Sequence, residues 1–214
     1  MNDFLFLSAS PNQRTSIAYR FADALLESFS KKHPAASVNR RDLAANPLPP
    51  LSAAYGAALT KHTPLDDPAF RQSEHLIAEL ERSSHLLIAT PMHNFTLPAT
   101  LKLWIDHVLR IGRSFSPGPD GKVGLLADRP TYIIVSSGGF HRGPQARQPD
   151  CLSDYLRLAL RTIGISDCHF IYLQGLVGGE GAVAAAFASA HEQLSQTPLF
   201  AGIEPMSSAL VSSV

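Results

Sequence analysis

The sequence is poor in charge and in cysteine. Charged residues make up 17% of its 214 positions, and 18 basic residues balance 18 acidic ones, so the formal net charge is zero. A neutral chain has no overall field that favours nucleic acid or an anionic membrane. The two cysteines, Cys151 and Cys168, are too few for a disulfide framework and are typical of small residues in a reducing cytosol.

Long hydrophobic runs are absent as well. No apolar stretch approaches the roughly 20 residues that cross a bilayer. Residues 1–16 contain an acidic residue and only a very short apolar run, which does not fit a signal peptide. We therefore expect a cytoplasmic protein that has no nucleic-acid or membrane partner.

Several catalytic signatures are also missing. The patterns G-x-x-x-x-G-K-[ST] and G-x-S-x-G do not occur, and His191-Glu192 lacks the second histidine of H-E-x-x-H. The nine histidines show no metal-ligand spacing. The nearest approach to a dinucleotide fingerprint, residues 179–184, follows the last predicted strand, so no further strand can complete the binding unit. We expect no metal site, no hydrolytic machinery and no Rossmann-type dinucleotide.

What the sequence does contain is an alternation of short apolar runs with segments of helical period. Strands are predicted at residues 4–7, 37–41, 85–89, 131–135 and 168–172, and amphipathic helices follow them. Residues 42–52 and 115–126 are excursions rich in proline or glycine, without a clear period.

This pattern predicts an α/β fold. Continuous apolar strands between helices indicate a parallel sheet that is covered on both faces. Five strands suit a flavodoxin-like three-layer sandwich of strand order 2-1-3-4-5. We predict one domain over residues 1–198. The tail at residues 199–214 is serine-rich and aperiodic, and we expect it to be disordered or to pack on a partner subunit.

Ligands of such sheets bind beyond the carboxyl ends of the strands. Three loops meet this condition: residues 8–18, 90–98 and 136–143. All three are rich in hydroxyl, amide or glycine groups and have almost no acidic residues.

The first loop favours a phosphate. Ser10, Thr15 and Ser16 precede a helix whose first turn offers free N–H groups and the positive end of its dipole. A single hydroxyl there could simply be an N-cap, a contribution of about 1 kcal/mol. Three hydroxyls, with Asn12 and Gln13 beside them, exceed what one cap needs.

The other two loops favour a flat ligand. In the second loop, Pro91 and Pro98 stiffen the ends, and Asn94 can donate and accept hydrogen bonds at the edge of a heterocycle. A rigid connection in which Asn94 caps the next helix explains this stretch equally well. In the third loop, Gly138 and Gly139 permit close approach of the backbone, although a plain turn would also use them. Together the three loops indicate flavin mononucleotide (FMN).

The chain resembles the FMN-dependent NADH-azoreductases, flavodoxin-like enzymes that also reduce quinones. The resemblance rests on five blocks in the family's order, namely S-x-S-P-x(4)-S at 8–16, RDLAANPLPPL at 41–51, PMHNFTLPATLKLWID at 91–106, SSGGFH at 136–141 and YLRLALRTIGISDCHFIYLQGL at 155–176. It implies a homodimer with a flavin site at the subunit interface. It also implies ping-pong transfer of two electrons from NADH or NADPH through FMN to a quinone or an aromatic azo compound. The chemistry belongs to FMN, so no catalytic side chain is expected.

Site residues follow from the resemblance by position. The first loop would hold the phosphate, the second would lie along the isoalloxazine ring, and the third would lie by its pyrimidine edge. The implied cofactor-binding residues are Ser10, Ser16, Ile17, Ala18, Pro91, Met92, His93, Asn94, Phe95, Ser136, Ser137, Gly138 and Gly139. The candidates on the substrate side are His93, His141, Phe115 and Thr162.

Four positions depart from the family pattern. His93 stands where tyrosine is usual, Ser137 where arginine is frequent, and Ala18 where serine is common. Thr162 replaces an aromatic residue that reaches the partner's site in many members. These changes leave backbone contacts to flavin intact but alter the surface that a second substrate meets. A flavin-binding redox sensor or carrier is therefore the alternative, and a protein that binds another phosphate ester would not explain the second and third loops.

Overall fold

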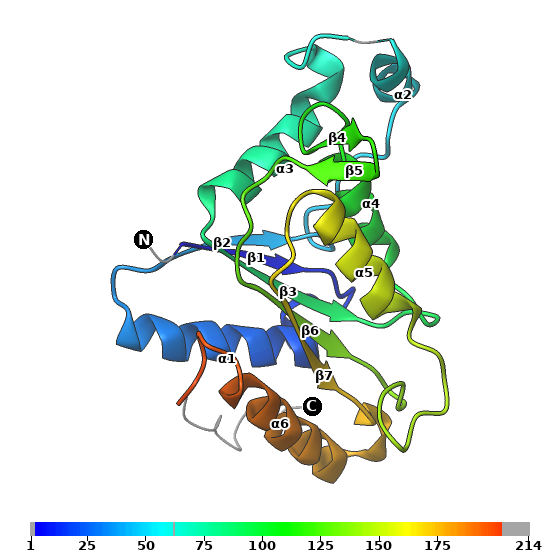
Figure 1. Cartoon of the computed structure of the whole chain (residues 1–214). Helices are drawn as coiled ribbons and strands as arrows, with labels where there is room; N and C mark the ends of the chain where they lie inside the picture. Colours follow the sequence, from blue (N-terminus) through cyan, green and yellow to red (C-terminus); the bar gives the residue numbers. More distant parts are fainter. Residues whose placement is uncertain (1–2, 62, 203–214) are drawn as a thin grey trace.

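The central sheet of the computed structural model, which describes residues 3–61 and 63–202, contains five parallel strands (Figure 1). They are β1 (Asp3–Ser8), β2 (Ser37–Asp42), β3 (His85–Pro91), β6 (Thr131–Ser136) and β7 (Cys168–Leu173). Their spatial order is β2-β1-β3-β6-β7. Numbered within the sheet alone, this is the predicted order 2-1-3-4-5, so the predicted fold class is confirmed.

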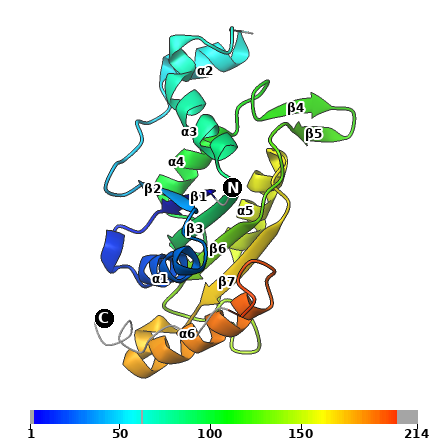
Figure 2. The ribbon, with the colours of Figure 1, turned by 90° about the vertical axis from the view of Figure 1, so that its left-hand side faces the viewer.

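Helices cover both faces of the sheet (Figures 1 and 2). On one face lie α1 (Ile17–Lys32) and α6 (Glu180–Ser195). On the other lie α3 (Arg71–Arg82), α4 (Ala99–Val108) and α5 (Cys151–Thr162). The inner strands consist mainly of apolar residues because neither of their faces meets water, and every residue of β6 is buried.

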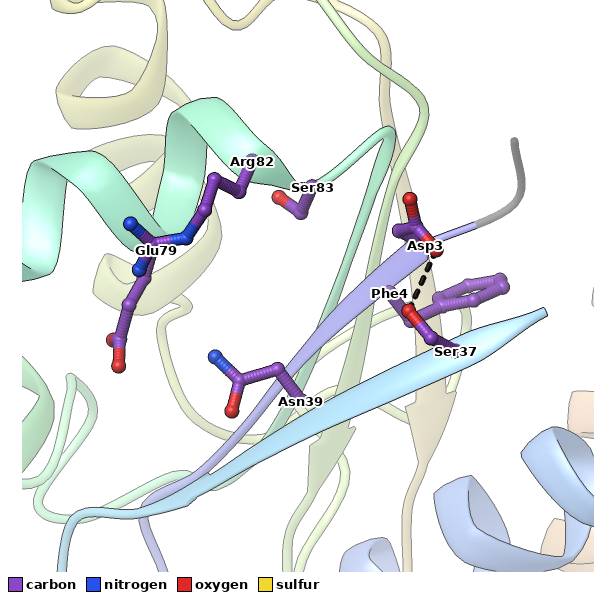
Figure 3. A pocket seen from close by; sticks show the side chains of 7 residues that line it. All are labelled: Asp3, Phe4, Ser37, Asn39, Glu79, Arg82 and Ser83. Carbon is purple, nitrogen blue, oxygen red and sulfur yellow. Dashed lines mark hydrogen bonds between the residues drawn. The ribbon is translucent and has the colours of Figure 1, made fainter.

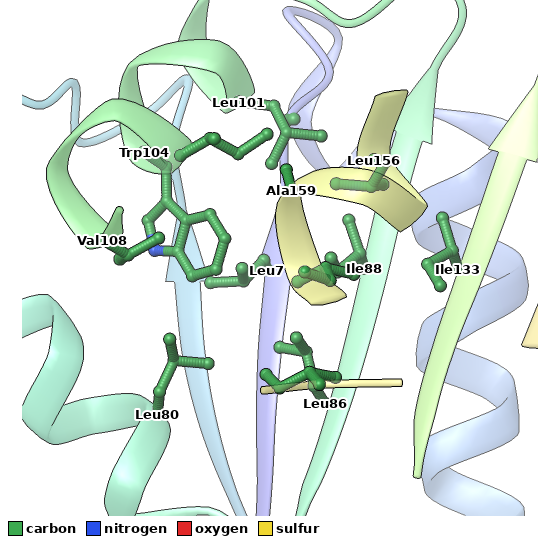
Figure 4. Close-up of a cluster of buried hydrophobic side chains, with 14 of the residues drawn as sticks. Leu7, Leu80, Leu86, Ile88, Leu101, Trp104, Val108, Ile133, Leu156 and Ala159 are labelled. Carbon is green, nitrogen blue, oxygen red and sulfur yellow. The ribbon is translucent and has the colours of Figure 1, made fainter. Parts of the chain in front are cut away.

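The packing on the second face shows why the helical spacing of the sequence is needed. Trp104 of α4, Leu80 of α3 and Leu156 of α5 converge on strand residues such as Leu7 and Ile88, as Figure 4 shows. All five side chains are buried at 0% exposure. Burying a side chain of this size contributes about 1.5–3 kcal/mol. This packing fixes α4 and α5 on the sheet, and the loops that precede them are thereby held in place.

The two excursions contain structure that the sequence did not reveal. Residues 115–126 include an antiparallel hairpin of β4 (Phe115–Gly118) and β5 (Gly121–Gly124). The first excursion leads into a short helix, α2 (Ala53–Thr60). In Figures 1 and 2 both lie on the side of α3, α4 and α5, away from α1 and α6.

Short 3-10 turns complete the described elements. They are η1 (Gln13–Thr15), η2 (Pro68–Phe70) and η3 (Leu176–Gly178). Of these, η2 leads directly into α3.

The end of the described chain packs on the core. Phe200 is 1% exposed and lies against Phe29 and Tyr132, with ring centroids 6.0 and 4.7 Å away. Residues 203–214 of the predicted tail lie outside the described residues. Within residues 3–61 and 63–202, no helix is long and apolar enough to span a membrane.

Candidate functional site

The three loops singled out in the sequence leave the sheet at its carboxyl edge, and the sheet pins their first residues. The Ala9 N–H donates to the Ala89 carbonyl at 3.0 Å, and the Met92 N–H donates to the Ser136 carbonyl at 2.8 Å. The Ser137 N–H donates to the Leu173 carbonyl at 2.9 Å. Each loop therefore starts beside the next strand, and the three form one continuous edge.

The first loop presents a hydroxyl and free N–H groups at the start of α1. Ser16 is the N-cap residue, yet its side chain makes no capping hydrogen bond. The Thr15 hydroxyl does not cap either, because it donates to the Asn12 carbonyl at 2.7 Å. The N-cap alternative is therefore not what the structure shows. The first-turn N–H groups, which begin at Ile17, remain available for an anion.

The second loop is a tight turn with two residues in the left-handed region. His93 and Thr96 exchange both backbone hydrogen bonds, at 2.9 and 3.0 Å, and the two residues between them have positive φ, Asn94 at 48° and Phe95 at 72°. Asparagine tolerates this conformation, but for phenylalanine it costs about 1–2 kcal/mol. The N-cap of α4 is Pro98, so Asn94 does not cap that helix.

Phe95 is unusual in a second respect. The residue is 48% exposed, although a large aromatic residue is normally buried. Its carbonyl accepts a hydrogen bond of 3.0 Å from the Cys151 N–H at the start of α5, which holds the strained turn. Strain at an exposed aromatic residue suggests that the turn is shaped for a ligand.

The third loop has its carbonyl groups turned inward. The carbonyls of residues 137–140 all accept hydrogen bonds from N–H groups further along the chain, three of them from residues 175–177. Within the part of the chain that the structure describes, the N–H groups of Gly138, Gly139 and Phe140 have no partner. Three successive donors at one edge of the sheet suit the carbonyl oxygens of a ligand.

Two side chains lie behind this row of N–H groups. The Ser137 hydroxyl donates to the Gly139 carbonyl at 2.7 Å and lies 3.0 Å from His141 Nδ1. His141 is 4% exposed, and its Nε2 atom is buried without a partner among the described residues. Burial lowers the pKa of His141 below its ordinary value.

All thirteen residues proposed for the cofactor lie at this edge, but the four substrate-side candidates do not lie together. His93 is exposed on the second loop, whereas His141 is buried. Phe115 is buried in β4 with Lys122 over its ring at 4.8 Å. Thr162 is the last residue of α5, which begins beside Phe95 and ends at the opposite edge of the sheet. Within one chain, Phe115 and Thr162 do not reach the three loops.

The sequence did not single out two glutamines that support the site. Gln174 Oε1 accepts the N–H groups of His141 and Arg142, both at 2.9 Å. The Gln148 amide lies beside Gly139 and donates to Met92 Sδ at 3.9 Å. The position of Gln174 directly after the last strand could have identified it as a residue of the carboxyl edge. Gln148 lies in a segment whose sequence has no pattern that indicates such a role.

A cavity of about 430 Å³ lies elsewhere, among Asp3, Phe4, Ser37, Asn39, Glu79, Arg82 and Ser83 (Figure 3). It sits toward the amino ends of the first two strands. Its carboxylates already have partners, since Asp3 accepts from the Ser37 hydroxyl at 2.6 Å and Glu79 from Arg41 Nε at 2.7 Å. Because the carboxylates of this cavity already have partners, we take the carboxyl edge of the sheet, and not the cavity, as the candidate site.

Neither a disulfide nor a cluster of metal-ligand side chains occurs among the described residues. Cys151 and Cys168 are free thiols, and burial raises the pKa of Cys168 to about 11. Among residues 3–61 and 63–202 no cluster of three or more histidine, cysteine or acidic side chains could hold a metal ion.

Comparison with known proteins agrees with the fold. Residues 2–197 match a family model described as having a flavodoxin-like fold. The FMN-dependent NADH:quinone oxidoreductase 4 of Pseudomonas fluorescens is 58% identical over 200 residues, which cover 94% of this chain and 97% of the relative. A Burkholderia lata enzyme, FMN-dependent NADH:quinone oxidoreductase 5, is 50% identical over 94% of this chain and 97% of its own length.

Solved structures show the same fold at lower identity. The azoreductase of Bacillus anthracis superposes with a TM-score of 0.75 over 90% of this chain and 97% of its own, at 22% identity. A Bacillus anthracis FMN-dependent NADH-azoreductase, solved in complex with FMN, gives a TM-score of 0.74 over 90% of this chain and 97% of its own, at 20% identity. The two sequence relatives at 58% and 50% identity show that this chain belongs to the family of the FMN-dependent NADH:quinone oxidoreductases.

Proposed function

We propose that the protein is an FMN-dependent NAD(P)H oxidoreductase that reduces quinones and aromatic azo compounds by two electrons, with ping-pong kinetics. The observation that carries this is the row of N–H groups at residues 138–140, which have no partner among the described residues, while the carbonyls of the same residues all accept hydrogen bonds. The pyrimidine edge of a flavin offers carbonyl oxygens to such donors. The relatives at 58% and 50% identity carry the corresponding enzyme name.

The residues present fit the phosphate of FMN. The Ser16 hydroxyl and the first N–H groups of α1 supply donors at the positive end of a helix of 16 residues. Ser10 is buried beside them at 5% exposure, and its hydroxyl accepts from the Asn12 N–H at 3.2 Å, which orders the approach to the helix. A phosphate held in this way needs no lysine.

The residues also fit the ring of FMN. Phe95 exposes an aromatic ring on a fixed turn, and the Asn94 side chain, which has no hydrogen bond among the described residues, can serve the imide edge. Pro91 and Met92 lead into this turn at half-buried positions. When bound, FMN supplies the hydride chemistry. The chain binds the ring, orients it and directs N–H donors toward the edge where negative charge develops on reduction.

We also propose a homodimer whose partner completes the substrate side. Phe115 and Thr162 lie away from the three loops of their own chain, so they could act only at the site of another. Apolar side chains nearby support this arrangement, since Leu158 of α5 and Val123 of β5 are 54% and 51% exposed. A location in the cytoplasm belongs to the same proposal and is supported by the two free thiols.

Anaerobic half-reactions test the function and separate an enzyme from a carrier. FMN-loaded protein is mixed with NADH, or with NADPH, until the flavin absorbance is bleached, and the nicotinamide is then removed before a small quinone is added. We expect rapid bleaching followed by rapid recovery of the oxidised spectrum. A flavin that neither donor bleaches at a useful rate would identify a carrier or sensor and refute the enzyme.

A further inference from the structure

The hydrogen bonds behind the third loop determine the protonation of His141. A serine hydroxyl has one proton, and the 2.7 Å separation of Ser137 Oγ from the Gly139 carbonyl oxygen requires that proton between two acceptors. Ser137 therefore cannot also donate to His141. The 3.0 Å contact of Ser137 Oγ with His141 Nδ1 is then a bond in which Nδ1–H donates.

The other ring nitrogen supports the same assignment. Nε2 of His141 is buried and has no partner among the described residues. A proton there would be a buried donor without an acceptor, which is costly, whereas a bare lone pair costs less. The charged groups that act on the ring are Asp150 and Arg142, in opposite directions, and the Tyr172 ring packs edge-on at 5.4 Å. His141 is thus neutral and protonated on Nδ1.

The hydrogen-bonded pair of Ser137 and His141 acts on the ligand-binding edge of the sheet through one peptide group, the one that joins Gly139 to Phe140. The carbonyl of a trans peptide and the N–H of the next residue point in opposite directions. The Ser137 hydroxyl holds the Gly139 carbonyl inward and thereby turns the Phe140 N–H outward. The only other hydrogen bond to that carbonyl among the described residues comes from the Gly175 N–H, at a longer 3.3 Å. Gly139 has no side chain to resist rotation of this peptide, so the serine bond is its main restraint.

We infer that Ser137 is a positioning residue: held by the Nδ1–H of neutral His141, it fixes the 139–140 peptide so that the Phe140 N–H faces the flavin edge. The role in flavin binding rests on the proposed function, but the hydrogen-bonded pair itself does not. The pair would favour reduced flavin more than oxidised flavin, because the negative charge of the reduced ring strengthens its bond to an N–H donor.

The test begins with the FMN-free protein. Nitrogen-15 spectra of labelled histidine distinguish the two neutral tautomers and the imidazolium ion. We expect His141 to be protonated on Nδ1 at pH 7, and to lose that preference in Ser137→Ala. Ser137→Thr, which keeps the hydroxyl, and His141→Asn, whose amide N–H can replace the Nδ1 donor, should both preserve the loop.

The second stage uses FMN-loaded protein. Ser137→Ala should weaken FMN binding about five- to tenfold, as expected for one hydrogen bond, and should lower the flavin midpoint potential. Ser137→Thr should restore both quantities. Ser195→Ala removes an exposed serine that also bonds a carbonyl, at 2.7 Å, and should change neither. Thermal melting confirms that each variant is folded.

The outcomes separate the two proposals. An Nε2-protonated or cationic His141 at pH 7 overturns the inference, and so does a Ser137→Ala variant with unchanged tautomer, FMN affinity and potential. If the protein binds no FMN while the spectra still show the Nδ1 tautomer and its loss in Ser137→Ala, the hydrogen-bonded pair stands. The proposed function, and with it the role of Ser137 toward flavin, then fails.

Discussion

Replacing Ser16 with alanine separates a ligand contact from a helix cap. Ser16 precedes α1 as its N-cap but makes no capping bond, so its loss should change the stability of the FMN-free protein by much less than the usual cap contribution of about 1 kcal/mol. Its hydroxyl is placed to donate to a phosphate. A hydrogen bond to a charged group contributes about 1.5–3 kcal/mol, so FMN affinity should fall roughly 10- to 150-fold.

A second serine provides the matched control. Ser52 is the N-cap of α2, and its side chain does accept the Tyr55 N–H at 3.1 Å. Ser52→Ala should therefore destabilise the protein by about 1 kcal/mol and leave FMN affinity unchanged. FMN titrations followed by fluorescence quenching and urea unfolding of both FMN-free variants give the two quantities. If Ser16→Ala destabilises the FMN-free protein as Ser52→Ala does while FMN binds as before, the phosphate assignment is wrong.

Three further predictions concern the turn, the hairpin and pH. Asn94→Ala should weaken FMN binding or slow flavin reduction, and it should also lower the melting temperature of the FMN-free protein because alanine tolerates the positive φ of this position poorly. Asn94→Gly, which tolerates that φ, should show the flavin defect alone. Unchanged affinity and reduction rate in both variants would refute the role of the Asn94 side chain. A Cβ on Gly124 would lie 2.1 Å from the Gly164 backbone N, so Gly124→Ala should destabilise the protein by about 1–3 kcal/mol. A Cβ on Gly56 would meet nothing within 4 Å, so Gly56→Ala should stabilise the protein slightly. Equal melting temperatures of the two variants would contradict the close packing at Gly124. Burial lowers the pKa of His85 and of His141, so below pH 6.5 the unfolded chain binds more protons than the folded chain. The contribution of these groups to stability is complete above that pH. Stability should therefore fall as the pH drops from 6.5 toward the folded pKa values. Urea unfolding at pH 7.5 and 5.5 measures this, and His141→Asn should reduce the difference.

Much of the fold follows from the sequence because its strongest signals are local. Each of the five sheet strands is a continuous apolar run or, for β2, a polar run at an edge, and each boundary lies within two residues of the prediction. The hairpin at residues 115–124 has no such signal. Its second strand approaches Gly164 closely at Gly124, and no local pattern contains this tertiary contact.

The candidate site, like the fold, could be predicted from the sequence only in part. The sequence indicates which loops meet, because parallel strands place their carboxyl ends on one edge. It does not indicate how the backbone runs within them. The turn at Phe95 accepts a bond from the start of α5, and the carbonyls of residues 137–139 accept N–H groups from residues 175–177. Such details come from segments that are remote in sequence.

FMN binding at this edge of the sheet can be read from the visible absorption spectrum of the purified protein. We expect a yellow protein, as isolated or after incubation with FMN and gel filtration, that releases about one FMN for each chain when it is denatured. A protein that stays colourless after incubation with excess FMN would show that this edge of the sheet does not bind FMN.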